Sequence, residues 1–106
     1  MAGSGRYRAV ISPEAAADLA AIHDYIANDS PKAAGKFVER VLQSIELLET
    51  LPHRTVVERR SDKIKYPVRI LPIGRYLIYF RVLENDLLVR ILTIRHGARR
   101  RIKKFP

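Results

Sequence analysis

The apolar residues in the first half of the chain recur at spacings of three and four, the period of one face of an α-helix. The first face consists of Ala15, Leu19, Ile22 and Ile26, and the second of Ala34, Val38, Val41, Ile45 and Leu48, with Phe37 beside them. A Ser-Pro pair precedes each face, and serine caps free helix N–H groups while proline suits the first helical turn. We expect two helices, the second ending at Pro52, and the short break at Asn28-Asp29 makes them fold back as a hairpin.

Strand patterns flank this hairpin on both sides. RYRAVI (6–11) precedes it, and RILPI (69–73) and RYLIYFRV (75–82) follow it, joined by a tight turn at Gly74. The alternation in the third strand places Tyr76, Ile78, Phe80 and Val82 on one face and Arg75, Leu77, Tyr79 and Arg81 on the other. After a turn at 84–86, LLVRILTIRH (87–96) is apolar on both faces, which is typical of an interior strand. Residues 53–68 show no clean period, so we expect a basic connection with room for a short strand.

This order predicts an α+β fold, β-α-α-β-β-β, in which the helix hairpin packs on one face of a mainly antiparallel sheet. The 106 residues suit one domain, 1–106, with residues 1–5 frayed and 101–106 forming a basic tail. No apolar run approaches the ~20 residues that span a bilayer. The chain has no cysteine, which excludes disulfides, thiolate metal sites and a thiol nucleophile. These features fit a cytoplasmic protein.

Charge is distributed unevenly along the chain, which carries a formal net charge of +9. Residues 13–52 hold three Lys/Arg against seven Asp/Glu, whereas residues 53–69 hold six against two and residues 95–106 hold six against none. Such asymmetry in a small domain indicates one basic face, which attracts a polyanion or an acidic partner. The alternative is that the high pI only aids solubility.

Most familiar chemical motifs are absent from the sequence. There is no Gly-rich phosphate loop and no paired metal-ligand motif, and His23, His53 and His96 fall in three different elements. We therefore expect no metal and no cofactor. The basic and aromatic residues that remain could bind phosphate and stack bases, or could cleave RNA without a metal. In that second case His96 would act as acid or base, and Arg69, Arg75 and Arg81 would bind phosphate.

The same residues also have plainer interpretations. A single histidine at a strand end, such as His96, is commonly a hydrogen-bonded structural residue, and Tyr76 and Tyr79 suit packing. Gly97 most simply permits a backbone turn that other residues avoid. Arginines scattered on a sheet usually form a solvated face, although the absence of any acid after Asp86 weakens that interpretation here.

Three local patterns in this order resemble the ParE branch of the RelE/ParE toxin superfamily. The patterns are YRAVISPEAAADLAAIHDYIA (7–27), RILPIGRYLIYFRV (69–82) and ILTIRHGAR (91–99). The resemblance spans roughly residues 7–100 and implies a bacterial type II toxin that a cognate ParD-like antitoxin holds inactive. It also implies one of two targets, because one branch cleaves mRNA on the ribosome and the ParE branch is linked to poisoning of DNA gyrase.

The end of the chain favours the gyrase branch. The cleaving branch tends to carry a tyrosine or a His-Tyr pair near its C-terminus, whereas this chain has His96-Gly97-Ala98-Arg99 and no tyrosine after Tyr79. Phe105 cannot replace a tyrosine in proton transfer because it has no hydroxyl. The leading hypothesis is therefore a non-enzymatic gyrase inhibitor, with a ribosome-dependent, metal-independent mRNA endoribonuclease as the alternative.

Each hypothesis names its own residues. The expected target-binding residues are Arg75, His96, Arg99 and Arg100, and the alternative catalytic set is His96, Arg69, Arg75 and Arg81. The expected antitoxin-binding residues are the apolar Leu19, Ile22, Phe37 and Val41, in a groove between the hairpin and the sheet, and the basic Arg59, Arg60, Arg75 and Arg99. A third hypothesis, a basic DNA-binding module without toxicity, finds no recognition-helix pattern in the sequence.

Overall fold

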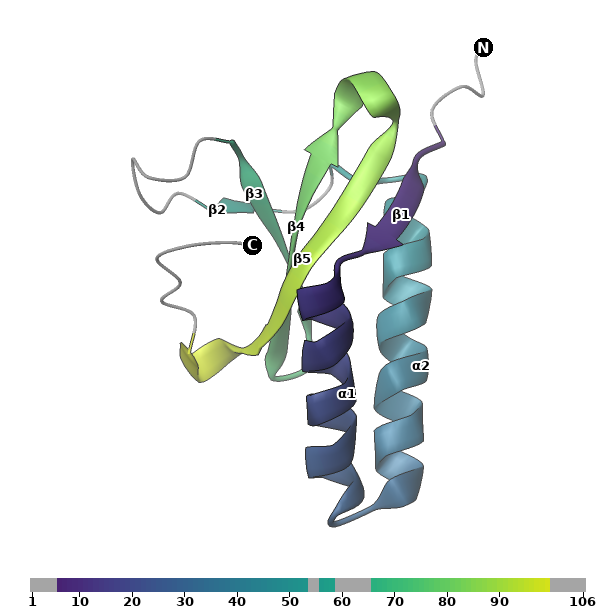
Figure 1. Ribbon diagram of the computed structural model, residues 1–106, viewed down its shortest axis with the longest axis vertical. Coiled ribbons are helices and arrows are strands. Elements are labelled where there is room, and N and C mark those ends of the chain that lie inside the picture. Colours follow the sequence, from purple (N-terminus) through teal and green to yellow (C-terminus); the bar gives the residue numbers. More distant parts are fainter. Residues whose placement is uncertain (1–5, 54–55, 59–65, 100–106) are drawn as a thin grey trace.

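One mixed sheet and one helix hairpin make up the fold (Figure 1). In this computed structural model, residues 6–53, 56–58 and 66–99 are described. The elements are β1 (Arg8–Ile11), α1 (Pro13–Ala27), α2 (Pro31–Leu48), β2 (Val56–Glu58), β3 (Val68–Ile73), β4 (Tyr76–Leu83) and β5 (Leu88–His96), with single 3₁₀ turns at Glu84–Asp86 and Gly97–Arg99. The strand order is β1-β5-β4-β3-β2, and every neighbouring pair is antiparallel except β1 and β5, which are parallel.

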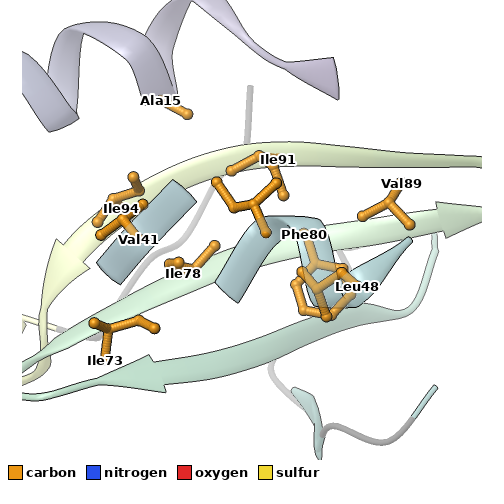
Figure 2. Packing of buried hydrophobic residues seen from close by; sticks show 10 residues of the cluster. Ala15, Val41, Leu48, Ile73, Ile78, Phe80, Val89, Ile91 and Ile94 are labelled. Atoms are coloured by element: carbon orange, nitrogen blue, oxygen red, sulfur yellow. The ribbon is translucent and has the colours of Figure 1, made fainter. Parts of the chain in front are cut away.

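The predicted α+β class and the packing of the hairpin on one sheet face are confirmed. α1 and α2 lie side by side in opposite directions (Figure 1), and their apolar faces meet the sheet in one core cluster. Figure 2 shows this cluster, whose buried members are Ala15, Val41, Ile45, Leu48, Ile73, Ile78, Phe80, Val89, Ile91 and Ile94. Each aliphatic side chain buried in it contributes about 1.5–3 kcal/mol. The connection before β3 contains the three-residue strand β2, which pairs with β3 at the edge of the sheet.

β5 is an interior strand, as its two apolar faces indicated. It lies between β1 and β4, and Leu92 belongs to a second buried cluster on the opposite face of the sheet, with Val68, Ile70 and Tyr79. The β4–β5 ladder contains a bulge, because Tyr79 pairs with Thr93 while Phe80 pairs with Ile91. The bulge turns Leu92 to the second face and leaves Ile94 on the helix face.

The start of α1 is bonded directly to β5 through Ser12. Its hydroxyl accepts a hydrogen bond from the N–H of Ala15 (3.0 Å), which caps the helix, and donates to the carbonyl of Leu92 (2.9 Å). Its own N–H donates to the carbonyl of Ile91 (3.0 Å). Ser12 is buried, so the cap and the attachment of α1 to the sheet are one hydrogen-bonded unit.

The outer edge of β1 is covered by the end of α2. The carboxylate of Glu49 accepts from the N–H of Ala9 (2.9 Å), and the Glu49 carbonyl accepts from the N–H of Tyr7 (2.6 Å). An edge strand with unpaired N–H groups is a template for pairing with another chain. Glu49 satisfies these two donors within the molecule.

A tight turn joins β3 to β4, as the glycine predicted. Gly74 has φ +58°, the left-handed region that favours glycine, and only Arg75 separates it from Tyr76 at the start of β4. A positive φ at the first of two central turn residues matches the twist of a hairpin.

We expect Ser12→Ala to destabilise the protein more than Ser30→Ala does. Ser30 caps α2 from an exposed position, whereas Ser12 also donates a buried hydrogen bond to β5. The expected losses in free energy of unfolding are about 1 kcal/mol for Ser30→Ala and about 2–3 kcal/mol for Ser12→Ala. Urea unfolding of both variants measures the difference. Equal losses would show that the bond to β5 contributes nothing beyond the cap.

Candidate partner-binding groove

An open groove of about 670 Å³ lies between α1 and the end of β5. One wall is formed by Ala21, Ile22 and Tyr25 of α1. The other is formed by residues from the β3–β4 turn and from the end of β5, and the full lining is Asp18, Ala21, Ile22, Tyr25, Arg75, Tyr76, Ile94, Arg95, His96 and Ala98. Tyr25 is 72% exposed, which is unusual for a large aromatic side chain and makes it the prominent feature of the α1 wall.

His96 is held at the end of β5 by its neighbours on both sides. Its ring packs edge-on against Tyr76 of β4, with 5.3 Å between ring centroids, and Tyr76 in turn contacts Phe37 of α2. The Nδ1 atom of His96 accepts a hydrogen bond from the N–H of Ala98 (3.1 Å). This bond leaves Nε2 to carry the ring hydrogen, so the histidine presents a donor from an exposed position.

Gly97 brings the β3–β4 turn and the end of β5 together. Its N–H donates to the carbonyl of Arg75 (2.7 Å), and a Cβ atom on Gly97 would lie 3.3 Å from the same oxygen. The prediction that Gly97 permits a special backbone turn is wrong, because its φ is not positive. The glycine instead allows a close approach of two backbones, which places Arg75 beside His96.

A hydrogen-bonded chain that the sequence did not reveal runs along the groove. Asp18 of α1 accepts, through one carboxylate oxygen, from the Thr93 hydroxyl and from the N–H of Ile94 (3.1 Å). The Thr93 oxygen accepts from Nε of Arg95 (3.1 Å). Asp18 therefore accepts from a backbone N–H at the edge of β5 beyond the end of β1. Because Thr93 is held by Asp18 and accepts from Arg95, the Arg95 side chain is held in place as well.

The structure brings together only part of each predicted residue set. Arg75 and His96 share the groove. Arg69 instead donates to the carbonyl of His53 (3.2 Å), and Arg81 lies over the ring of Tyr66, 3.8 Å from its centroid, beside the second buried cluster. The four residues of the alternative catalytic set are thus spread over three places.

The predicted antitoxin groove between hairpin and sheet is filled by side chains. Val41 is fully buried in the core, so its side chain is not accessible to a partner, and Leu19 and Phe37 pack against the same core. Ile22 alone of the four apolar residues also lines the open groove. Of the basic residues, Arg59, Arg60 and Arg100 lie outside the described residues, and Arg99 ends the 3₁₀ turn that follows His96.

Metal binding finds no support within the described ranges. There, no three His, Cys, Asp or Glu side chains are grouped so that they could hold a metal ion. Neither helix in the same ranges is long and apolar enough to cross a membrane.

A separate polar cluster ties the N-terminal segment to the β4–β5 turn. The Tyr7 hydroxyl donates to Glu84 (2.6 Å), and the ring of His53 makes a second hydrogen bond to the same carboxylate. These two bonds, with nearby positive charge, hold the pKa of Glu84 below its ordinary 4.5. The bond to Glu84 also raises the pKa of Tyr7 above its ordinary 10.0.

Fold and groove together define a small α+β domain with a basic, aromatic-walled groove at one end of its sheet. Residues 9–101 match the family described as the ParE toxin of the type II toxin–antitoxin system parDE. The chain belongs to this family of ParE toxins. A search of curated proteins finds no match.

Solved structures with a similar fold come from toxin–antitoxin systems. A chain of the chromosomal ParDE system from P. aeruginosa is 25% identical, with a TM-score of 0.67 over 87% of this chain and 97% of that chain. A chain of the RelBE2 toxin–antitoxin complex from Mycobacterium tuberculosis is 20% identical, with a TM-score of 0.60 over 86% and 91%. A chain of the archaeal RelE–RelB complex from Pyrococcus horikoshii is 19% identical, with a TM-score of 0.61 over 89% and 98%.

The cluster around Glu84 predicts a defined pH dependence of stability. Because the folded state lowers the pKa of Glu84, its stabilisation is present above the unfolded pKa and is lost as pH falls through the folded pKa. The raised pKa of Tyr7 gives stabilisation that is present below pH 10 and is lost as pH rises through the folded pKa. The free energy of unfolding of wild type should therefore exceed that of Glu84→Gln most clearly between about pH 5 and 9, and the gap should narrow below about pH 4.

Urea unfolding across this pH range tests the cluster, with Glu39→Gln on the exposed side of α2 as the matched control. A difference in free energy of unfolding between wild type and Glu84→Gln that stays constant, or that widens towards acid pH, would contradict the lowered pKa of Glu84.

Proposed function

We propose that this protein is the toxin of a ParDE-like type II system that arrests growth by binding and inhibiting DNA gyrase. Membership of the ParE family supports the toxin role. The observation that carries the choice of target is the arrangement of basic side chains: Arg75, Arg95 and His96 line one open surface. This arrangement suits contact with an acidic surface of a partner more than reaction at one phosphate.

Metal-independent RNA cleavage needs an acid, a base and cations around a single phosphate, each within hydrogen-bond reach. Arg69 and Arg81 lie away from His96, and they are engaged by a carbonyl and by a tyrosine ring. The sequence after Tyr79 also lacks a tyrosine. One observation favours the alternative endoribonuclease, because Tyr25 lines the same groove as His96 and Arg75 and carries a hydroxyl.

The partner that holds this toxin inactive is, in our proposal, a cognate ParD-like antitoxin in the cytoplasm. The solved relatives come from toxin–antitoxin systems, which supports such a partner. A chain with net charge +9 suits an antitoxin segment in which acidic residues alternate with apolar anchors.

Supercoiling by purified gyrase tests the proposed target. Wild-type protein at about micromolar concentration should inhibit supercoiling, and Arg75→Glu should raise the concentration needed by at least about tenfold, because it reverses a charge in the groove. Arg90→Glu is the matched control, since Arg90 is exposed on the same sheet but does not line the groove.

Unchanged supercoiling at this concentration would contradict the proposal. Mapping of mRNA ends after induction then decides the alternative, since cuts in the ribosomal A site that vanish in His96→Ala would establish the endoribonuclease.

Binding kinetics with the antitoxin test the second part of the proposal. Raising salt to ~0.5 M should slow association far more than it speeds dissociation, because charge steers the encounter while apolar anchors set the lifetime. Charge reversal at Arg99 and Arg100 should slow association and leave the toxin folded. Stopped-flow and dissociation measurements across salt concentrations give both rates. An off-rate that rises as steeply as the on-rate falls would contradict this mechanism.

A further inference from the structure

The α1 wall of the groove is apolar and aromatic. It is formed by Ala21, Ile22 and Tyr25, and α1 contains no lysine or arginine anywhere along its length. Tyr25 is 72% exposed, so its ring is accessible from the groove. An exposed aromatic ring is a surface on which a flat, uncharged group such as a nucleobase stacks well.

The opposite wall is basic. Arg75 and Arg95 line it together with His96, whose Nε2 carries the ring hydrogen and adds a further donor. Within the part of the chain that the structure describes, no acceptor is bonded to the guanidinium of Arg75 or to the terminal nitrogens of Arg95. Guanidinium groups suit phosphate especially well, because their donors are charged and can make bidentate contacts with its oxygens.

Arg95 is held in place by bonds that leave its outer end free for a ligand. Its Nε donates to the hydroxyl oxygen of Thr93 (3.1 Å), and this hydroxyl donates in turn to Asp18. The same Asp18 oxygen accepts from the N–H of Ile94 (3.1 Å), so its negative charge is shared between two donors at the edge of β5. A guanidinium fixed at its base loses little further side-chain entropy when its terminal nitrogens bind a ligand.

We propose that this groove binds a purine nucleoside triphosphate, with the base stacked on Tyr25 and the phosphates bound by Arg75 and Arg95. Such a ligand is flat and uncharged at one end and polyanionic at the other, and the two walls divide in the same way. The groove volume of about 670 Å³ lies within the range of small-molecule sites. A purine suits the site better than a pyrimidine, because its two fused rings cover more of the tyrosine ring.

A mononucleotide fits these walls better than a nucleic acid strand does. A strand carries a phosphate at every nucleotide and needs cations along its whole path. Here the basic side chains line one side only, and α1 on the other side contains Asp18 and Asp24. Because the groove is open and leaves part of the ligand in solvent, we expect a dissociation constant of about 0.1–1 mM.

The proposal goes beyond the toxin role and does not depend on the target of the toxin. It concerns a small-molecule ligand of the protein by itself. A bound nucleotide would cover Ile22, Arg75 and His96, so it would compete with any protein partner that uses the same surface.

NMR titration of the whole ¹⁵N-labelled protein tests the site with three ligands. ATP carries both ends of the proposed ligand, adenosine carries only the base and sugar, and inorganic tripolyphosphate carries only the anion. The comparison separates a nucleotide site from the general attraction of anions to a chain of net charge +9. We expect ATP to shift the amide signals of residues 21–25 and 94–98, and to bind at least about tenfold more tightly than either partial ligand.

Variants assign the two ends of the ligand. Arg95→Gln should weaken both ATP and tripolyphosphate at least about fivefold. Arg90→Gln is the matched control, because Arg90 is exposed on the same strand outside the groove, and it should leave both ligands nearly unaffected. Tyr25→Ala should weaken ATP at least about fivefold but not tripolyphosphate, and Tyr25→Phe should retain ATP binding, because the ring and not the hydroxyl makes the stack. The same spectra report whether each variant is folded.

Three results would overturn the proposal. The first is the absence of shifts in residues 21–25 and 94–98 at about 5 mM ATP. The second is binding of ATP no tighter than that of tripolyphosphate, which would show attraction of charge alone. The third is an equal loss in Arg95→Gln and Arg90→Gln. The titration contains no gyrase, so its failure leaves the supercoiling test of the proposed function untouched, and failure of that test leaves nucleotide binding to be judged by the titration.

Discussion

The attachment of α1 to β5 is the constraint on which the candidate partner-binding groove depends. Ser12 bonds the first turn of α1 to the carbonyl of Leu92, and Asp18, six residues later, bonds the same helix to Thr93 and Ile94. α1 therefore follows the edge of β5 past the point where β1 ends (Figure 1). Since a helix rises 1.5 Å per residue, Tyr25 lies about 20 Å along α1 from Ser12, where it faces the last residues of β5 across the groove.

The bulge in β5 sets which of its side chains face the helices. A strand with strict alternation would place Leu92 and Ile94 on the same face, but here they belong to opposite clusters. The bulge keeps Ile94 on the helix face, and Thr93 beside it bonds to Asp18. The hydrogen bonds that secure α1 to β5 thus also hold Arg95 at the groove.

Much of the fold follows from local patterns in the sequence. The Ser-Pro caps, the helical spacing of Ala15 to Ile26 and the alternation in β4 depend on residues close together in the chain, and the structure agrees with each. The parallel pairing of β1 with β5 joins residues about 80 positions apart, and nothing in RYRAVI reveals its direction. The sequence of a strand that is apolar on both faces does not show whether the strand contains a bulge, because apolar side chains are buried in either register.

The site was less predictable than the fold because it depends on contacts between residues far apart in the chain. Arg75 and His96 could be singled out as a cation and a titratable group at element ends, but their proximity depends on the backbone contact of Gly97. The roles of Asp18, Thr93 and Tyr25 exist only where helix and strand meet. Val41, which the helical pattern placed on the apolar face, proved to belong to the core and not to a groove.

The central claim is that partners engage this toxin through the groove between α1 and the end of β5. Amide hydrogen exchange of the toxin, measured with and without gyrase, tests it most directly. The account predicts added protection in residues 21–25 and 94–98, at the two walls of the groove. Protection confined to β3 and to Arg81 on the opposite face of the sheet, with the groove unchanged, would contradict it.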